Sequence, residues 1–410
     1  MSLSESTSLH VLIAGGGIGG LTAALTLAQN GCRVSLFEQA KVFSETGAGL
    51  QLSPNASRVL HDLGLESALQ HMGFLPEGTQ FRHWRTGRVI AESELGAAVT
   101  ERYGAPYYHL HRGDLLSVLV TAATAHSAIT LHTDARVESF ADHDSGVTLR
   151  ACGIDHVGDL LVGADGIHSV ARSALWGAQE PRFTGNVAWR AMVPSARLPK
   201  DLIRPMSTVW WGPGKHFVHY YVRGGAFVNC VCVVEKSGWE VESWTEPGDH
   251  AELKADFRGW HDDIVQLLDQ ADRDSLFKWA LYDRPPMAQW GRGRITLLGD
   301  ACHPTLPFMA QGAAMAIEDA AVLAGCLVQD GPIVERLQRY ETLRRPRTAG
   351  IQKGSRRNAT VFHLSGVKAW LRNRAAGAAR HRTMDTLFRY NALEAARSPV
   401  AKEPHDQSSN

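Results

Sequence analysis

The chain has 410 residues, and its 42 lysines and arginines balance 42 aspartates and glutamates, so the formal net charge is zero. A zero net charge gives no electrostatic reason to expect nucleic acid or an acidic membrane surface as a partner. Hydrophobic residues make up 44% of the chain, which is enough for a packed core and argues against disorder. At about 150 residues per domain, the length predicts two or three domains.

The cysteines and the N-terminus point to a reducing compartment. No two of the 6 cysteines have metal-knuckle spacing, so we interpret them as ordinary thiols and expect no metal site. The N-terminus lacks a basic segment followed by an apolar one, and no uncharged apolar stretch reaches the ~18 residues of a membrane span. We therefore expect a cytoplasmic protein with no membrane span.

The N-terminal elements predict a βαβ unit around a glycine-rich turn. An apolar strand at 10–14 leads into glycines, a helix pattern at 21–29 and a second strand at 33–37. Gly15, Gly17 and Gly20 satisfy the G-x-G-x-x-G spacing, in which the glycines permit a tight turn and close approach of a pyrophosphate. Glu38 ends the second strand, where a carboxylate can bind a ribose. The context predicts dinucleotide binding, and a purely structural glycine turn is the alternative.

Two later segments place a carboxylate at the end of an apolar strand. Asp165 belongs to an Asp-Gly pair, and Asp300 follows a strand predicted at 294–298. Beyond Asp300, a helix predicted at 312–328 begins with glycine, so its first N–H groups can point at an electron-accepting ring. Each motif alone is more often structural, but the three in this order are specific.

The middle of the chain has the pattern of a second sheet. Aromatic and β-branched residues cluster at 207–211, 216–222 and 226–234, between glycine-rich turns, which predicts antiparallel hairpins. After residue 334 the chain is rich in arginine and predicts helix.

Together these motifs resemble the single-component flavoprotein aromatic hydroxylases, which have the p-hydroxybenzoate hydroxylase fold. Segments 47–55, 110–115 and 303–312 suggest the branch of salicylate hydroxylases, 3-hydroxybenzoate 6-hydroxylases and 6-hydroxynicotinate 3-monooxygenases. The resemblance implies an α/β (α+β) fold in which an antiparallel-sheet substrate domain is inserted into a Rossmann-like FAD-binding domain. The implied ranges are 8–180 and 286–350 for the FAD-binding domain, 181–285 with part of 70–110 for the substrate domain, 351–400 for a C-terminal helical segment, and 401–410 for a disordered tail.

The resemblance also implies FAD as cofactor and NADH or NADPH as cosubstrate. The lack of a second glycine fingerprint fits transient docking of the nicotinamide. For Arg112, the alternative is a surface salt bridge with Asp114. The implied cofactor-binding residues are Gly15, Gly17, Gly19, Gly20, Glu38, Gln39, Gln51, Arg112, Val137, Asp165, Asp300, Gly312 and Ala313.

On the substrate side, a hydroxylated phenol needs a base near its hydroxyl group. His216 and Tyr220 are four apart in a predicted strand and therefore face the same side, while His219 and Tyr221 face the other. The resemblance implies that His216, Tyr220 and Pro307 are the catalytic residues. The alternative is that His216 caps the turn at 212–214 and that Tyr220 is sheet packing.

Other residues leave the substrate open. Phe308 stands where some salicylate and hydroxynicotinate relatives have histidine, and Gln51 stands where hydroxynicotinate relatives have one, and both departures count against the hydroxynicotinate substrate. No arginine is singled out for a substrate carboxylate among Arg82, Arg85, Arg190 and Arg223. We expect His168 and His303 to be packing or hydrogen-bonded residues, and Arg344, Arg345 and Arg347 to form a solvated helix face or ion pairs.

The main hypothesis is an FAD-dependent monooxygenase that hydroxylates a small phenolic acid of the salicylate or 3-hydroxybenzoate type, using NAD(P)H, O₂ and a flavin C4a-hydroperoxide. The alternatives are a 6-hydroxynicotinate-type hydroxylase, another FAD-dependent oxidase or a halogenase, and a non-catalytic flavin-binding protein. A homodimer is a family expectation only.

Overall fold

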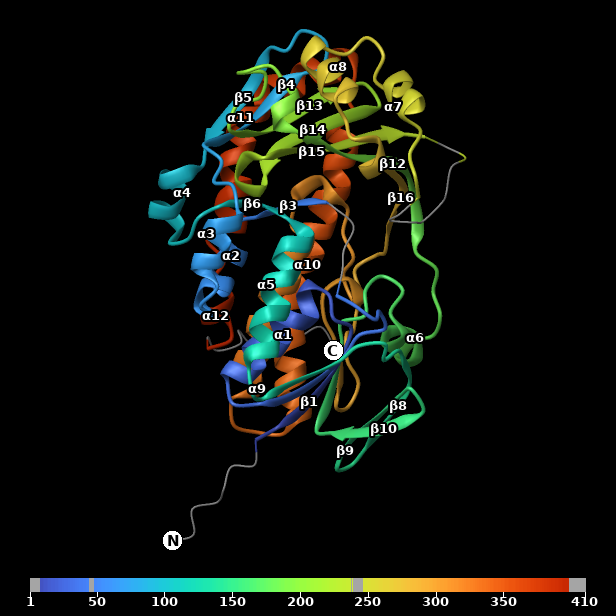
Figure 1. Cartoon of the computed structure of the whole chain (residues 1–410). Helices are drawn as coiled ribbons and strands as arrows, with labels where there is room; N and C mark the ends of the chain where they lie inside the picture. The colour runs from blue at the N-terminus through green and yellow to red at the C-terminus, as the bar shows by residue number, and fades with distance from the viewer. Residues whose placement is uncertain (1–7, 44–47, 237, 239–245, 398–410) are drawn as a thin grey trace, which may run out of the picture.

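The structure is a computed structural model that describes residues 8–43, 48–236, 238 and 246–397. Gly47 and the tail predicted at 401–410 lie outside these residues. The two largest sheets lie at opposite ends of the molecule, and helix α10 (Ile333–Phe362) runs from one to the other (Figure 1). Within the described ranges, no helix combines the length and apolar character needed to cross a membrane.

The lower sheet contains five parallel strands in the order β17-β11-β1-β2-β7. The strands are β1 (His10–Ala14), β2 (Arg33–Phe37), β7 (Ile129–His132), β11 (Leu160–Gly163) and β17 (Ile295–Leu297). Their residues form apolar runs because both faces of a parallel sheet are covered by other elements. Since β17 comes from late in the sequence, this sheet joins N-terminal and late segments.

Helices α1 (Ile18–Gln29) and α9 (Gly312–Leu327) pack against each other beside this sheet. Small buried residues such as Ala23 and Ala320 allow the close approach, and the Thr26 hydroxyl donates to the Ala320 carbonyl at 3.2 Å. The other helices are α2 (Pro54–Asp62), α3 (Glu66–Met72), α4 (Gly96–Tyr103), α5 (Arg112–Ala125), α6 (Val170–Trp176), α7 (His250–Asp256), α8 (Asp262–Asp269), α11 (Gly366–Phe388) and α12 (Ala392–Ala395).

The upper sheet has seven strands in the order β16-β12-β15-β14-β13-β4-β5. The strands are β4 (Gly78–His83), β5 (Val89–Glu94), β12 (Arg182–Pro194), β13 (Met206–Gly212), β14 (Lys215–Val222), β15 (Phe227–Glu235) and β16 (Phe277–Asp283). All neighbours are antiparallel except β13 and β4, which are parallel. That pair departs from the predicted hairpins because β4 reaches the sheet from an earlier part of the chain.

Both faces of the upper sheet are covered. One face carries Trp189 and Phe217, which pack with Phe257, the residue after α7, and with Ile264 of α8 in one apolar cluster. The opposite face carries Trp211, which packs in a second cluster with Phe308 and Phe362. Side chains alternate between these faces along each strand.

Two smaller sheets complete the fold. Strands β8 (Val137–His143), β9 (Gly146–Ala151) and β10 (Ile154–Gly158) form an antiparallel sheet at the lower end. Strands β3 (Gly49–Leu52) and β6 (Tyr108–His111) pair between the two large sheets. The Gly49 N–H donates to Asn229 Oδ1 at 2.8 Å, so β3 is bonded directly to the upper sheet.

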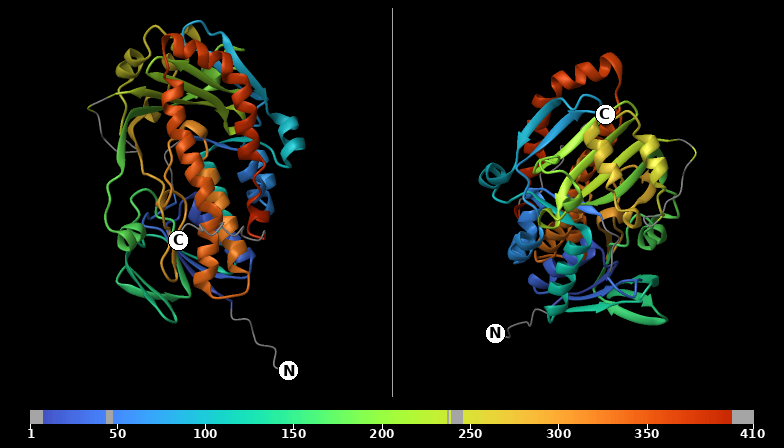
Figure 2. Two further views of the ribbon diagram at one scale, coloured as in Figure 1. Left: turned by 180° about the vertical axis from the view of Figure 1, so that it is seen from behind. Right: turned by 45° about the horizontal axis from the view of Figure 1, so that its top comes forward.

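Helix α10 does not follow the predicted division of the chain between residues 350 and 351. It continues through that point and also through Pro346, and Figure 2 shows it as one long helix from behind. A Cβ atom on Gly354 would lie 2.9 Å from the Met309 sulfur, so the helix packs closely on the loop before α9. Tertiary contacts therefore support one continuous helix across the boundary that the sequence predicted.

Candidate active site

The glycine-rich turn between β1 and α1 can be built only with glycine at two positions. Gly15 has a φ of +105°, and a Cβ there would lie 2.4 Å from the Ala164 carbonyl oxygen. A Cβ on Gly20 would lie 2.0 Å from the Gly15 carbonyl oxygen. Gly17 differs, because a Cβ there would meet no described atom within 4 Å. The turn thus leaves open space at Gly17, directly before the N-terminus of α1, where a pyrophosphate is favoured.

Glu38 lies beside this turn at the end of β2. Its carboxylate accepts hydrogen bonds from the backbone N–H groups of Gly16 and Ala40, each at 2.8 Å. These two bonds hold the carboxylate in place next to the glycines. Two other residues were predicted to bind the cofactor here. Gln39 is exposed, and Val137 begins β8 and packs against the apolar core around the lower sheet.

Asp165 lies in the loop between β11 and α6 and offers a hydrogen-bond acceptor that no described residue uses. Its Oδ2 accepts a hydrogen bond from the Ala171 N–H at 3.1 Å. Its Oδ1 is buried and has no hydrogen-bond partner among the described residues. Since a buried carboxylate oxygen without a partner is costly, the site fits a ligand that brings a hydroxyl or N–H group.

Asp300 lies in a short 3₁₀ turn (Gly299–Ala301) after β17, and its side chain is exposed. Although solvent reaches this side chain, the many protein atoms around the carboxyl desolvate it and raise its pKa, while the electrostatic influence of His303 and Arg112 lowers it. Arg112 begins α5, and its N–H donates to the Ala48 carbonyl at 2.7 Å. Asp114, the alternative partner predicted for Arg112, accepts hydrogen bonds from Arg223 at 2.7 and 2.9 Å.

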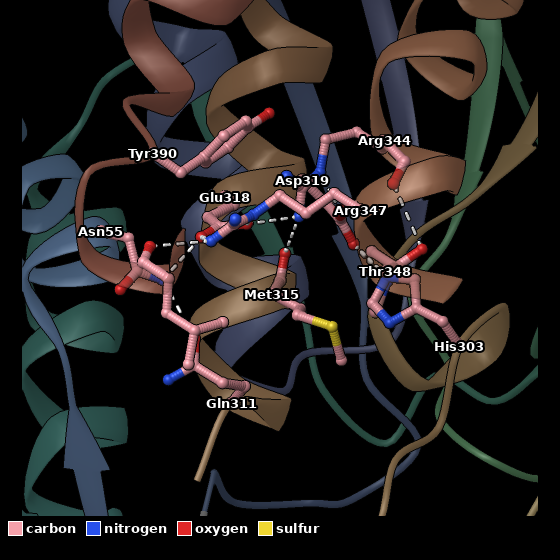
Figure 3. Close-up of polar contacts among 12 residues, drawn as sticks. Asn55, His303, Gln311, Met315, Glu318, Asp319, Arg344, Arg347, Thr348 and Tyr390 are labelled. Carbon is pink, nitrogen blue, oxygen red and sulfur yellow. Dashed lines mark hydrogen bonds and ion pairs between the residues drawn. The ribbon is translucent and has the colours of Figure 1, made fainter. Parts of the chain in front are cut away.

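The helix that begins with Gly312 and Ala313 is anchored by a buried ion network (Figure 3). Glu318 and Asp319 on α9 are fully buried, as is Arg344 on α10. Arg344 lies 2.7 Å from Glu318 and 2.6 Å from Asp319, and Arg347 contacts Glu318 at 2.7 Å. These arginines were expected to form either ion pairs or a solvated helix face. The prediction of ion pairs is confirmed, and the prediction of a solvated face is wrong for Arg344.

The network also reaches the Asp300 turn and the start of α9. Asp319 Oδ2 accepts a hydrogen bond from the Gly299 N–H at 3.1 Å and lies 2.5 Å from His303 Nε2. On the other side, Asn55 donates to Glu318 at 2.6 Å and to Gln311, the N-cap of α9, at 3.1 Å. Two predicted cofactor contacts, at Asp300 and at Gly312, are therefore fixed by one cluster.

The charges of this network set the ionisation of its acids. Burial by itself would raise the pKa of Glu318, but the positive charges of Arg344 and Arg347 hold it below its ordinary value. Burial likewise opposes ionisation of Asp319, and His303 and Arg344 outweigh it and lower its pKa. Sequence analysis missed Glu318 and Asp319 as site residues, although an adjacent acidic pair within an apolar helix is a signal that could have identified them.

These features together fit FAD. The open space at Gly17, the unpartnered Asp165 oxygen and the fixed Glu38 carboxylate all lie at the ends of β1, β11 and β2, and ligands bind at the carboxyl ends of such strands. Gly312 and Ala313 begin a 16-residue helix without a side-chain cap, so their N–H groups can face a negatively charged ring edge.

On the upper sheet, His216 and Tyr220 lie on the same face of β14, with Val218 between them. The His216 ring packs against Phe308, with ring centroids 5.1 Å apart. Tyr220 packs instead with Met192 and with the His109 ring at 4.6 Å. His219 faces the opposite side, where its Nε2 accepts from Trp210 at 3.0 Å, so the predicted alternation of this strand is confirmed.

His216 does not cap the turn at 212–214, as the alternative interpretation had it. Its Nδ1 lies 2.8 Å from Nε2 of His363, the residue after α10. Desolvation lowers the pKa of His216 well below its ordinary value, and His363 lowers it further. His216 is therefore a neutral imidazole near pH 7, which is the form that can accept a proton.

Pro307 and Gln51 lie on either side of this region. Pro307 begins a 3₁₀ turn (Pro307–Met309), is exposed, and its carbonyl accepts from the Ala310 N–H at 3.1 Å. Gln51 on β3 donates to Ser207 of the upper sheet at 3.1 Å and accepts from the Tyr107 hydroxyl at 2.6 Å. Whether either residue contacts a cofactor or substrate stays a prediction.

Sequence analysis also missed His109, which follows Tyr108 on β6. It is fully buried, and neither ring nitrogen has a hydrogen-bond partner among the described residues. Burial lowers its pKa to about 3, so it is neutral. A neutral buried imidazole beside Tyr220 offers polar atoms to a ligand.

The arginines considered for a substrate carboxylate lie in different places. Arg82 pairs with Asp263 of α8 at 3.1 Å, Arg223 pairs with Asp114, and Arg85 is exposed. Arg190 is buried on β12, where its guanidinium lies over the rings of Phe277 and Trp279. Arg190 shares its sheet face with Met192, and therefore with Tyr220.

Comparison with known proteins gives the same assignment. Residues 8–355 match the FAD binding domain family, and the chain belongs to that family. It is 40% identical to 3-amino-4-hydroxybenzoate 2-monooxygenase PtnB3 from Streptomyces platensis, over 89% of this chain and 92% of that one. It is 37% identical to 3-hydroxybenzoate 6-hydroxylase from Klebsiella oxytoca, over 89% and 91%. The solved structure of Klebsiella pneumoniae HpxO with FAD and uric acid is 26% identical, with a TM-score of 0.83 over 96% and 99%.

The chain is thus an FAD-dependent aromatic monooxygenase with the p-hydroxybenzoate hydroxylase type of fold. The predicted fold class, cofactor and enzyme class are confirmed. The 3-hydroxybenzoate branch of the resemblance is confirmed as well. Sequence analysis did not name the 3-amino-4-hydroxybenzoate enzymes, which no motif distinguished.

Proposed function

We propose that this monooxygenase hydroxylates a small phenolic aromatic acid, with NADH or NADPH as reductant and O₂ as the source of oxygen. The observation that carries the proposal is His216, a buried neutral imidazole. Its ring packs beside that of Phe308, and Phe308 directly follows the exposed Pro307. A phenol reacts best with an electrophilic oxygen when it is ionised, so a base at this place assists the reaction. FAD, when bound, supplies the redox chemistry that activates O₂.

The residues of the chain would divide the remaining work. His216 accepts the phenol proton, Phe308 and Tyr220 enclose the ring, and Arg190, buried on the same sheet face, balances the carboxylate. The ion network of Glu318, Asp319 and Arg344 fixes the N-terminus of α9, whose N–H groups would hold the cofactor ring. The substrates named for the two relatives, 3-amino-4-hydroxybenzoate and 3-hydroxybenzoate, each carry the phenolic hydroxyl and the carboxylate that these roles of His216 and Arg190 require.

The first experiment is anaerobic stopped-flow reduction of the bound flavin by NADH and by NADPH. The reduction rate is measured with salicylate, 3-hydroxybenzoate, 3-amino-4-hydroxybenzoate or no aromatic, and benzoate serves as the control without a phenolic hydroxyl. We expect one phenol to accelerate reduction by orders of magnitude and, in air, to gain one oxygen atom by mass spectrometry. Fast reduction that is indifferent to every aromatic, with hydrogen peroxide as the only product, would favour an oxidase and refute the proposal. A homodimer and a cytoplasmic location stay predictions.

A further inference from the structure

A chain of hydrogen bonds leads from His216 to the surface. His216 Nδ1 lies 2.8 Å from His363 Nε2, and His363 Nδ1 lies 2.8 Å from Glu235 Oε1. His216 lies on β14, His363 directly follows α10, and Glu235 is the last residue of β15. They are therefore brought together only by the tertiary fold.

Burial falls sharply along this chain. His216 is 2% exposed, whereas the Glu235 side chain is 57% exposed. The rings of Phe308 and Phe362 pack against His216 at centroid distances of 5.1 and 5.3 Å, and so separate it from solvent. Glu235 lines an open cavity of about 710 Å³ on the surface, together with Asn186 and Thr360. The inner end of the chain is thus dry, and the outer end is in water.

The donors and acceptors of the chain point in one direction. A carboxylate can only accept, so Glu235 takes a hydrogen bond from Nδ1–H of His363. The Nε2 atom of a neutral His363 is then an acceptor, and it receives Nδ1–H of His216. This leaves the lone pair of His216 on Nε2, which has no hydrogen bond to any described residue. The tautomers are inferred from this network.

We propose that His216, His363 and Glu235 form a proton relay that carries the proton of the substrate phenol from the buried site to the solvent at the cavity. The relay rests on the proposed function, because it needs a phenol at His216. The phenol O–H bond breaks as the Nε2–H bond of His216 forms, and Nδ1–H of His216 passes to Nε2 of His363. Nδ1–H of His363 then passes to Glu235, which releases a proton to water. Each group loses one proton and gains one, and no electrons are transferred.

Burial keeps both imidazoles neutral, as a relay of this kind requires. Burial lowers the pKa of His363, Glu235 raises it, and Arg372 of α11 lowers it. The other charged groups at the outer end line the cavity and are Arg182, Lys236, Asp283 and Arg356. Asp283 pairs with Arg182 at 3.3 Å and also binds Arg356, so its single negative charge offsets part of the positive charge of these two arginines.

The test measures proton transfer directly with 4-hydroxy-3-nitrobenzoate, the nitro analogue of 3-amino-4-hydroxybenzoate, whose phenolate absorbs visible light. The FAD-loaded protein is saturated with this probe and jumped from low to high pH in a stopped-flow instrument. The variants are Glu235→Gln and His363→Asn, which keep polar groups but cannot pass a proton along the chain. The control is Glu92→Gln on β5, which removes an exposed carboxylate that is paired with Arg204.

We expect both relay variants to slow the appearance of phenolate about tenfold or more, with the dissociation constant of the probe unchanged. Glu92→Gln should match the wild type. Added imidazole buffer should restore the rate of Glu235→Gln in proportion to its concentration, because a solvent base can replace an exposed carboxylate. A purely structural role of Glu235 would give no such rescue.

The two proposals fail in different ways. If the enzyme hydroxylates a phenol but both relay variants release its proton at the wild-type rate, the relay is wrong and the proposed function stands. If the wild type neither binds the probe nor hydroxylates any tested phenol, the proposed function is wrong and the relay falls with it.

Discussion

The ion network at the start of α9 and the aromatic face of β14 are both buried, but the titratable groups of the first are charged and the histidine of the second is neutral. Around α9, Glu318 and Asp319 are ionised and matched by Arg344 and Arg347. Around β14, His216 is neutral, its pKa is lowered by burial, and Phe308 and Phe362 surround it. A buried ion pair holds its partners in fixed positions, whereas a neutral histidine can gain and lose a proton.

The difference separates two tasks of one site. On the proposed function, charges that must stay in place would position the helix N-terminus and the Asp300 turn for the cofactor. The group that must change its protonation would face the substrate. Helix α10 joins the two regions, since Arg344 lies on it and His363 directly follows it.

Breaking the charged region should have the largest effect. Arg344→Met leaves Glu318 and Asp319 buried with half their positive partners removed, and should lower the free energy of unfolding by about 3–5 kcal/mol. Urea denaturation of the apoprotein measures this. Arg345→Met is the control, because that side chain is 41% exposed and pairs with Glu341, and it should cost about 1 kcal/mol or less. Equal losses in both variants would mean that the network does not stabilise the fold.

Breaking the neutral region should instead act on catalysis. His216→Gln should lower kcat about a hundredfold, equivalent to about 2.7 kcal/mol, because the phenol loses its base. Its control is His219→Gln, which removes a buried histidine from the opposite face of the same strand. Steady-state kinetics with the phenol found above should show normal kcat for the control. A hundredfold loss in both variants would place the effect in the sheet rather than at His216.

Acid should lower the stability of the protein in two pH ranges, one set by buried neutral histidines and one set by the acids of the ion network. His109 and His219, each with a pKa lowered to about 3, are neutral when folded but bind protons above that value when unfolded. Stability should therefore fall as the pH drops below about 6.5, the value for an unfolded histidine. Glu318 and Asp319 have lowered pKa values, so their contribution is present above about 4.5 and is lost below it.

Urea midpoints between pH 8 and 3, taken as the measurement, should show these two stages. His219→Gln should reduce the upper stage only. An unchanged upper stage in this variant would contradict the assignment to buried histidines.

The smallest effect should come from the helix that joins the regions. Gly350 is exposed in α10, and a Cβ there would meet no described atom within 4 Å. Gly350→Ala should raise the free energy of unfolding by about 0.5–1 kcal/mol and leave kcat unchanged. Gly354→Ala is the contrasting variant, since its Cβ would lie 2.9 Å from the Met309 sulfur. Thermal unfolding of both variants measures the effect, and equal shifts would mean that the Met309 contact is not constraining.

The local patterns of the sequence were enough for the first βαβ unit and for dinucleotide binding, and the family resemblance then implied FAD. The apolar run at 10–14, the glycine spacing after it and Glu38 identify a βαβ unit, because each depends on residues close together in the chain. Strand periodicity likewise placed His216 and His219 on opposite faces, since alternation is a property of a single strand. What lies within one element, or across one turn, could be predicted.

Contacts between distant segments could not be predicted in this way. Glu318 is matched by Arg344, His216 meets His363 and Glu235, and β4 pairs with β13 in parallel, and in each case the partners are far apart in sequence. From the sequence alone, Arg344 has the pattern of a surface residue, and its burial follows from the packing of α9 against α10. His363 likewise has the pattern of an ordinary helix end, and its contact with His216 follows from the position of β14 beside it. The sequence by itself determined the first strands and helix, the glycine turn and, through the family resemblance, FAD. Only the tertiary structure decided which charges are matched and which histidines stay neutral, because both depend on burial, which no local pattern encodes.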